Sequence, residues 1–139
     1  MFAWVVKHLH FLSKLPLLAH FYNSLLLLQS FVFRRDKFEW ICKVEERIQQ
    51  MEGVSLSLHS YGGLQFNIGG KELGHMHGNA LLDVYVGVRH RDYCMANFAC
   101  AQHHVLEHSG AWVSLWMNEE RDFQFAVALL EFVYQQHQK

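Results

Sequence analysis

The chain has 139 residues, which suits one domain with a hydrophobic core. Its 12 basic and 13 acidic residues give a net charge of −1, which excludes a broad electrostatic nucleic-acid surface, and we expect no nucleic-acid partner. Three cysteines without a Cys-x-x-Cys pair (Cys42, Cys94 and Cys100) predict free thiols in a reducing compartment, and therefore a cytoplasmic location.

The first 33 residues form a strongly apolar segment with no acidic residue and only two lysines. Pro16 divides this segment, and the pattern predicts helices over residues 3–13 and 17–32. Three structures fit it: core helices, an amphipathic hairpin at a membrane surface, or a spanning anchor. We therefore separate residues 1–33, with peripheral membrane contact as one alternative, from a domain over residues 34–139. One face of the second helix carries apolar residues at helical spacing: Leu18, Phe21, Leu25, Leu28 and Val32.

The next segment predicts a third helix with clear boundaries. Asp36 is the expected N-cap, with Glu39 three residues later in a capping-box arrangement, and Gly53 ends the helix. The hydrophobic period then changes to alternation, which is typical of strands, and paired glycines supply the turns. Strands are predicted over residues 54–59, 64–68, 71–77 and 80–86.

The last third of the chain continues with a helix over residues 89–101 and a strand over residues 111–117. A final helix follows, capped by Asn118. This order predicts an α+β fold. Its antiparallel sheet is a meander plus one later strand, with helices packed on one face and further helices at the N-terminus.

Histidine is the outlier of the composition, because the chain has eleven and seven of them lie in residues 59–108. His75 and His77 are predicted on one strand face, with their Cβ atoms roughly 6.5–7 Å apart, so both side chains can reach one metal ion. Three histidines with an open position are typical of catalytic zinc, whereas two histidines and a carboxylate suit non-haem iron. Further ligands would come from His103, His104, His108 or Asp83.

Two alternatives to metal binding stay open for the same histidines. They line a metal-free polar pocket, or they are structural residues that Glu72 or Asp83 satisfies. The cofactor is therefore either none or a divalent metal, and the metal-ligand candidates are His75, His77 and His104. Three other histidines are predicted at the surface without a role: His59, His90 and His137.

The histidine-rich segment over residues 102–108 is followed by Ser109 and Gly110. Two tryptophans then lie on one predicted strand face. No Gly-x-Ser-x-Gly elbow surrounds Ser109, which favours a loop serine over a nucleophile. Trp112 and Trp116 either belong to the core or line a ligand pocket.

Two blocks of sequence resemble the luciferase-like domain family, which includes fungal luciferases and uncharacterised bacterial relatives. The first block is Tyr-Gly-Gly-Leu-Gln-Phe at residues 61–66 with Glu-Leu-Gly-His-Met-His-Gly at residues 72–78. The second is His-His-Val-Leu at residues 103–106 with Ser-Gly-Ala-Trp-Val-Ser at residues 109–114. Fungal luciferases oxidise a hydroxylated pyrone with molecular oxygen and carry an apolar N-terminal segment. The resemblance therefore implies a pocket for a small organic molecule.

The leading hypothesis is an oxygen-dependent oxidoreductase that acts on a small, largely apolar organic molecule. The alternatives are a non-catalytic small-molecule binding module and a membrane-associated interaction protein. The candidate catalytic residues are His75, His77, His104 and Ser109, and the candidate substrate-binding residues are Glu72, Asp83, His103, Gly110, Trp112 and Trp116. We expect His75 and His77 to point the same way, and His103 or His104 to approach them. The oligomeric state does not follow from the sequence.

Overall fold

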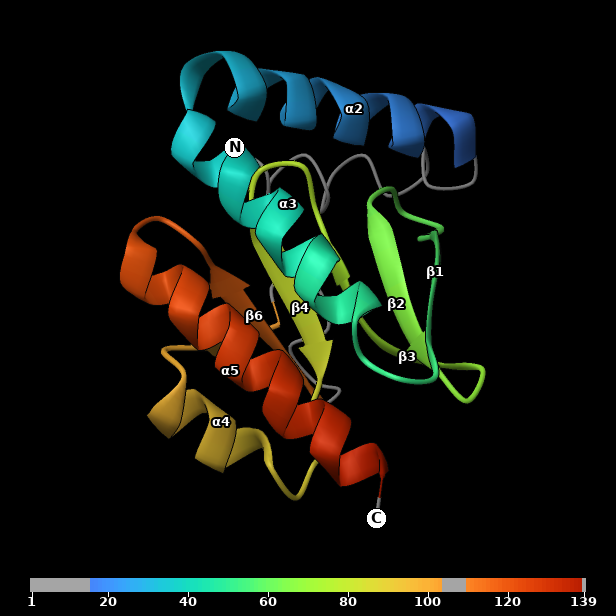
Figure 1. The fold of residues 1–139 in the computed structure, drawn as a ribbon, viewed down its shortest axis with the longest axis vertical. Helices are drawn as coiled ribbons and strands as arrows, with labels where there is room; N and C mark the ends of the chain where they lie inside the picture. Colours follow the sequence, from blue (N-terminus) through green and yellow to red (C-terminus); the bar gives the residue numbers. More distant parts are fainter. Residues whose placement is uncertain (1–15, 104–109, 139) are drawn as a thin grey trace.

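The computed structural model describes residues 16–103 and 110–138. Its helices are α2 (Pro16–Phe33), α3 (Arg35–Gln49), α4 (Arg91–Asn97) and α5 (Glu120–His137). Its strands are β1 (Val54–Leu58), β2 (Leu64–Ile68), β3 (Lys71–Met76), β4 (Leu81–Tyr85), β5 (Ala101–Gln102) and β6 (Trp112–Trp116). Figure 1 shows the helices grouped around one twisted sheet.

The strands of the described residues form one antiparallel sheet in the order β1-β2-β3-β4-β6-β5. The first four strands follow one another as a meander, and β6 then joins the sheet beside β4. This is the α+β architecture that the sequence predicts, with β6 as the later strand. The two-residue β5 adds a short edge that the sequence pattern did not predict.

One face of the sheet carries the hydrophobic core. Side chains alternate between faces along a strand, so Leu82 and Val84 of β4 point to the same side as Val113 and Leu115 of β6. Helices α3 and α5 lie across this face (Figure 1), which confirms the prediction that helices pack on one face. The two helices contribute Trp40, Ile41, Val44, Ile48, Ala126, Leu129, Leu130 and Val133 to the core.

Helix α2 lies across one end of the sheet and packs against the turn after β3 (Figure 1). The hydroxyl of Ser30 donates a hydrogen bond to the carbonyl oxygen of Gly78 at 2.7 Å, and the Gly78 N–H donates to Asn23 Oδ1 at 2.8 Å. A Cβ atom added to Gly78 would lie 2.6 Å from the backbone nitrogen of Leu27. Only glycine therefore permits this close approach of helix and turn.

The outer side of α2 is apolar and exposed. Leu17 is 84% exposed, Phe21 60%, Leu28 56% and Phe33 76%. None of the helices in residues 16–103 and 110–138 has both the length and the apolarity to cross a membrane. The predicted helix over residues 3–13 lies outside the described residues, and the division between residues 1–33 and 34–139 stays a prediction.

Both predicted N-cap residues are wrong by one or two positions. Arg34 is the residue that precedes α3, and Asp36 lies inside the first turn, where its carboxylate pairs with the Arg34 side chain at 2.8 Å. At the other end of the chain Glu119, rather than Asn118, caps α5. A capping box forms there, because the Glu119 side chain accepts from the helix backbone while Asp122 accepts from the Glu119 N–H.

The helix predicted over residues 89–101 is shorter than expected and ends at Asn97. Ala99 then adopts a φ of 52°, which turns the chain away from a helical path. The two residues that follow Cys100 pair with β6 as strand β5. Pairing with a distant strand therefore overrides the local helical pattern, which is a weak preference by comparison.

Candidate functional site

A row of polar side chains crosses the face of the sheet opposite α3 and α5. His75 of β3 lies opposite Asp83 of β4, which lies opposite Ser114 of β6. Directly opposed residues of antiparallel strands point to the same face. All three side chains are buried. Strand pairing thus aligns an imidazole, a carboxylate and a hydroxyl across three strands.

A register shift between β2 and β3 adds Glu72 to this face. Phe66 pairs with Gly74, whereas the next residue of β2, Asn67, pairs with Glu72, so β3 holds one extra residue at this point. Residues three apart on a regular strand point to opposite faces, but a bulge of this kind brings Glu72 to the side of His75. Glu72 Oε1 accepts a hydrogen bond from His75 Nδ1 at 2.6 Å.

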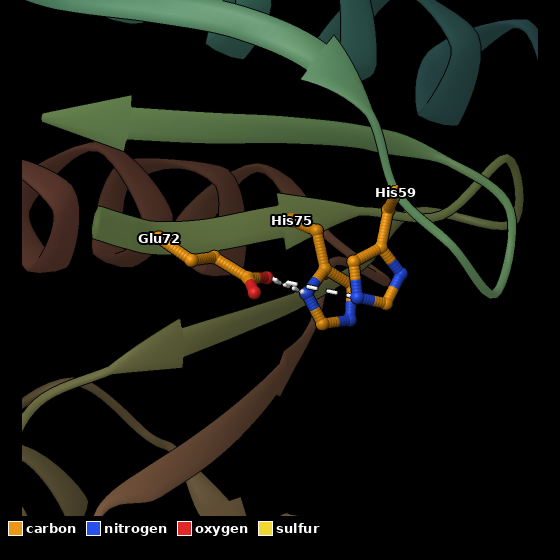
Figure 2. Close-up of side chains that lie close together, drawn as sticks. All are labelled: His59, Glu72 and His75. Carbon is orange, nitrogen blue, oxygen red and sulfur yellow. Dashed lines mark hydrogen bonds and ion pairs between the residues drawn. The ribbon is translucent and has the colours of Figure 1, made fainter. Parts of the chain in front are cut away.

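His59, the residue after β1, stacks on His75, as Figure 2 shows. The ring centroids are 3.7 Å apart with 9° between the planes, and His59 Nε2 lies 3.7 Å from Glu72 Oε1. His59 is 8% exposed, so the prediction of a surface histidine is wrong. The physical reason is that His59 continues the alternation of β1 and points to the same face of the sheet as Ser55 and Ser57. That face is exposed at these serines but buried at His59.

Asp83 is the centre of the cluster. Its Oδ2 atom lies 3.2 Å from His77 Nε2, 3.4 Å from His75 Nε2 and 3.6 Å from His103 Nε2. Its Oδ1 atom accepts a short hydrogen bond from the hydroxyl of Ser114. Asp83 is fully buried, and the three histidines are nearly so. We call this group the histidine cluster: His59, His75, His77 and His103 with Glu72 and Asp83.

The two stacked imidazoles have opposite electrostatic character. Burial would lower the pKa of His75, but its hydrogen bonds with Asp83 and Glu72 outweigh burial and raise that pKa to about 9. Burial, reinforced by the positive charge on His75, lowers the pKa of His59 to about 4. Burial opposes the ionisation of Glu72, yet the hydrogen bond from His75 holds the pKa of that carboxyl below its usual value. His75 is therefore held positively charged between two carboxylates, and a neutral His59 stacks against it.

Aromatic rings border the cluster. The ring of Trp112 lies 5.8 Å from that of His75 and 5.9 Å from that of His103, and Tyr85 packs edge-on against it at 5.5 Å. Trp116 shares the strand face of Trp112 but lies four residues further along β6, where it is partly exposed. Trp112 therefore borders two of the histidines, His75 and His103.

Two overlapping triads in the described residues have the ligand types and the spacing to hold a metal ion. One is His59, Glu72 and His75, and the other is His75, His77 and Asp83. In each triad the donor atoms lie within 4.8 Å of one another. His75 belongs to both triads, with Nδ1 facing Glu72 and Nε2 facing Asp83.

The structure brings together most of the residues that the sequence singled out. His75 and His77 converge on one oxygen atom as expected, and Glu72, Asp83, His103 and Trp112 surround them. A Cβ atom added to Gly110 would lie 3.8 Å from Arg91 Nη1 and 4.0 Å from Val88 Cγ2. His104 and Ser109 lie outside the described residues. The roles assigned to all these residues stay predictions.

Sequence reasoning missed two members of this site. The signal for His59 was its place in the alternation of the first strand, on the same face as Ser55 and Ser57. The signal for Ser114 was its place midway between Trp112 and Trp116 on one strand face. Neither signal shows that this face is buried, because burial depends on segments that are distant in sequence.

Comparison with known families places this site inside a recognised domain. Residues 70–132 match the family model described as Luciferase domain. The match confirms the resemblance carried by the two histidine-rich blocks, and it spans every member of the histidine cluster except His59. No curated protein and no solved structure gives a significant match to the chain.

Proposed function

We propose that this luciferase-like domain is an oxygen-dependent oxidoreductase that acts on a small, largely apolar organic molecule at the histidine cluster. The observation that carries the proposal is the convergence of His75, His77 and His103 on one carboxylate oxygen of a fully buried Asp83. The resemblance to fungal luciferases supports molecular oxygen as the co-substrate.

The burial of the cluster supports a functional origin. A carboxylate removed from water destabilises the fold by several kcal/mol unless it is paired. Replacing a buried ion pair by apolar residues of similar volume is often neutral, or stabilises the fold by about 1–4 kcal/mol. The core face of the same sheet consists of apolar residues instead, such as Leu82 and Val84, the sequence neighbours of Asp83. Shifted pKa values of the kind found at His59 and His75 gather at functional sites.

The chemistry of the cluster suits the activation of a hydroxylated substrate. Molecular oxygen reacts far more readily with an electron-rich anion than with the neutral molecule, so such an enzyme needs a base and a positive charge. His59 is held neutral, so it can accept a hydrogen bond from a substrate hydroxyl. The positive charge between Glu72 and Asp83 can stabilise the anion that results.

The neighbouring aromatic rings favour a flat, apolar substrate. Trp112 and Tyr85 form an aromatic wall beside His75 and His103. Tyr61 lies on another side, with its ring 5.5 Å from that of His59. Aromatic walls with a few polar groups are typical of sites for small organic ligands.

Oxygen uptake by the full chain with a panel of hydroxylated pyrones and phenols tests the proposal. We expect His77→Gln to lower the rate at least about 100-fold, since it removes one of the three imidazoles that converge on Asp83, and acid–base groups contribute about 10²–10⁴-fold. His137→Gln, at the exposed end of α5, is the matched control and should retain the rate. An unchanged rate in a folded His77→Gln protein would contradict the proposal. Ligand binding without oxygen uptake would favour the binding module instead.

A second candidate function is peripheral membrane association through α2. The observation that favours it is the row of exposed apolar side chains on this helix, followed directly by Arg34 and Arg35. Apolar residues flanked by cations are typical of helices that lie in the interface of anionic membranes.

Sedimentation with anionic vesicles tests this second function. Burying one Leu or Phe side chain contributes about 1.5–3 kcal/mol, so a Phe21→Ser and Leu28→Ser double variant should bind at least about 10-fold more weakly. Leu58→Ser is the matched control, because Leu58 is 73% exposed but lies on β1, outside α2. Equal binding by all three proteins would exclude α2 as the membrane contact.

A further inference from the structure

We propose that His75, His77 and Asp83 form a binding site for one divalent first-row transition-metal ion. The inference rests on the proposed function, because it names the cofactor of the same site. It is chosen over the second triad, His59 with Glu72 and His75, on the geometry of the rings.

The donor atoms have the separation that a shared ion requires. Ligand atoms about 2.0–2.1 Å from one ion at tetrahedral angles lie about 3.3–3.4 Å from one another. His75 Nε2 lies 3.4 Å from Asp83 Oδ2, and His77 Nε2 lies 3.2 Å from the same atom. An ion between these atoms would replace the contacts that the two imidazoles make with the carboxylate.

The ring planes separate the two triads. A histidine nitrogen binds a metal through a lone pair that lies in the plane of its ring. The rings of His75 and His77 are nearly perpendicular, at 84°, so their planes intersect and both lone pairs can meet at one ion. The rings of His59 and His75 are parallel and stacked 3.7 Å apart, so their lone pairs run side by side without meeting.

Neighbouring groups hold two of the three ligands as they do in known metal sites. Metal-binding histidines commonly donate their second ring N–H to a carboxylate, which fixes the ring and makes it a better ligand. His75 makes this contact with Glu72 at 2.6 Å through Nδ1, which leaves Nε2 for the ion. The Oδ1 atom of Asp83 is held by the Ser114 hydroxyl, which leaves Oδ2 directed at the histidines.

The charge and the donor types decide the kind of ion. Two carboxylates, Glu72 and Asp83, face the cluster, and both form ion pairs with its histidines. A divalent ion would neutralise both. Two imidazole nitrogens and one oxygen suit iron, cobalt or zinc rather than magnesium or calcium, which prefer oxygen ligands. Three protein ligands also leave positions for other molecules on the ion.

Cobalt(II) binding to the tag-free full chain tests the proposal, with the visible spectrum as readout beside elemental analysis of the protein as purified. We expect about one ion per chain, bound through nitrogen and oxygen ligands. His77→Gln and Asp83→Asn should weaken binding at least about 100-fold, and Ser114→Ala, which keeps all three ligands, about 10-fold. His59→Gln and the surface control His137→Gln should bind as the wild type does.

Four results would overturn the metal site. They are a wild-type chain that binds no cobalt(II), binding that survives in a folded His77→Gln protein, binding that is lost in His59→Gln, and binding that is lost in His137→Gln. Circular dichroism of each variant separates loss of ligand from loss of fold, and the wild-type measurement stands even where a variant does not fold. Bound metal without oxygen uptake would refute the proposed function alone. Oxygen uptake by a wild-type chain that binds no cobalt(II) would refute the metal site alone.

Discussion

Asp83 shows how single residues compensate for burial in this protein. Its carboxylate has no exposed surface, yet it sits between hydrophobic neighbours on β4. Three imidazoles approach one oxygen and the Ser114 hydroxyl donates to the other. Because hydrogen bonds to charged groups contribute more than neutral ones, Ser114 should matter to stability out of proportion to its size.

We expect Ser114→Ala to lower the free energy of unfolding by about 1–3 kcal/mol, since a hydrogen bond to a buried charge is lost. Urea denaturation of the metal-free protein measures this change. Ser55→Ala is the matched control, because Ser55 is exposed on β1 and should change stability by less than about 0.5 kcal/mol. Equal effects of the two substitutions would show that Ser114 does not support the carboxylate.

The contact between α2 and the turn after β3 connects an element to the site. Gly78 is adjacent to His77, and its backbone bonds with Ser30 and Asn23 hold α2 against it. A side chain here would meet helix backbone, which cannot move aside as a flexible side chain can. The position of His77 therefore depends on the docking of α2.

We expect Gly78→Ala to loosen α2 and to destabilise the fold by about 1–3 kcal/mol through overpacking. Limited proteolysis followed by mass spectrometry should detect new cleavage within residues 16–33. Gly53→Ala is the control, because its positive φ of 76° strains alanine although nothing lies within 4 Å of the added Cβ. That variant should lose stability without new cleavage in α2. Full protection of α2 in Gly78→Ala would contradict the docking argument.

At the scale of the whole molecule, α2 has two sides with different consequences. Its inner side contributes Leu27 and Ser30 to the packed structure, whereas its outer side leaves large apolar side chains exposed. Removal of residues 1–33 would therefore expose the backbone of the turn after β3. It would also remove the apolar surface proposed to meet a membrane.

We expect a chain that begins at Arg34 to unfold at a lower urea concentration than the full chain and to lose binding to anionic vesicles. Both measurements are made on the same two proteins, so an effect on stability can be distinguished from an effect on membrane binding. Unchanged stability would support an independent domain over residues 34–139. Lower stability with vesicle binding retained would leave α2 as a structural helix only.

The sequence by itself determined the type of most elements and the resemblance to the luciferase-like domain family. Local periodicity is a property of neighbouring residues, so the alternation of residues 54–68 and the helical stripe of α3 could be read directly, and the α+β meander is confirmed. The histidine-rich blocks carried the family resemblance for the same reason, and that resemblance is confirmed too. The sequence did not determine the N-cap of α3, because the Asp36 carboxylate pairs with the Arg34 side chain instead of capping the helix.

Only the tertiary structure decided which side chains meet. His59 joins the cluster by stacking on His75, Ser114 reaches Asp83 of the cluster through strand pairing, and Glu72 joins through a bulge between β2 and β3. Strand β5 exists because β6 offers an edge to pair with. Register, bulges and burial arise from contacts between segments that are far apart in the chain. A pattern of neighbouring residues therefore predicts where histidines lie on a strand, while the packing of the sheet decides which of them share a carboxylate.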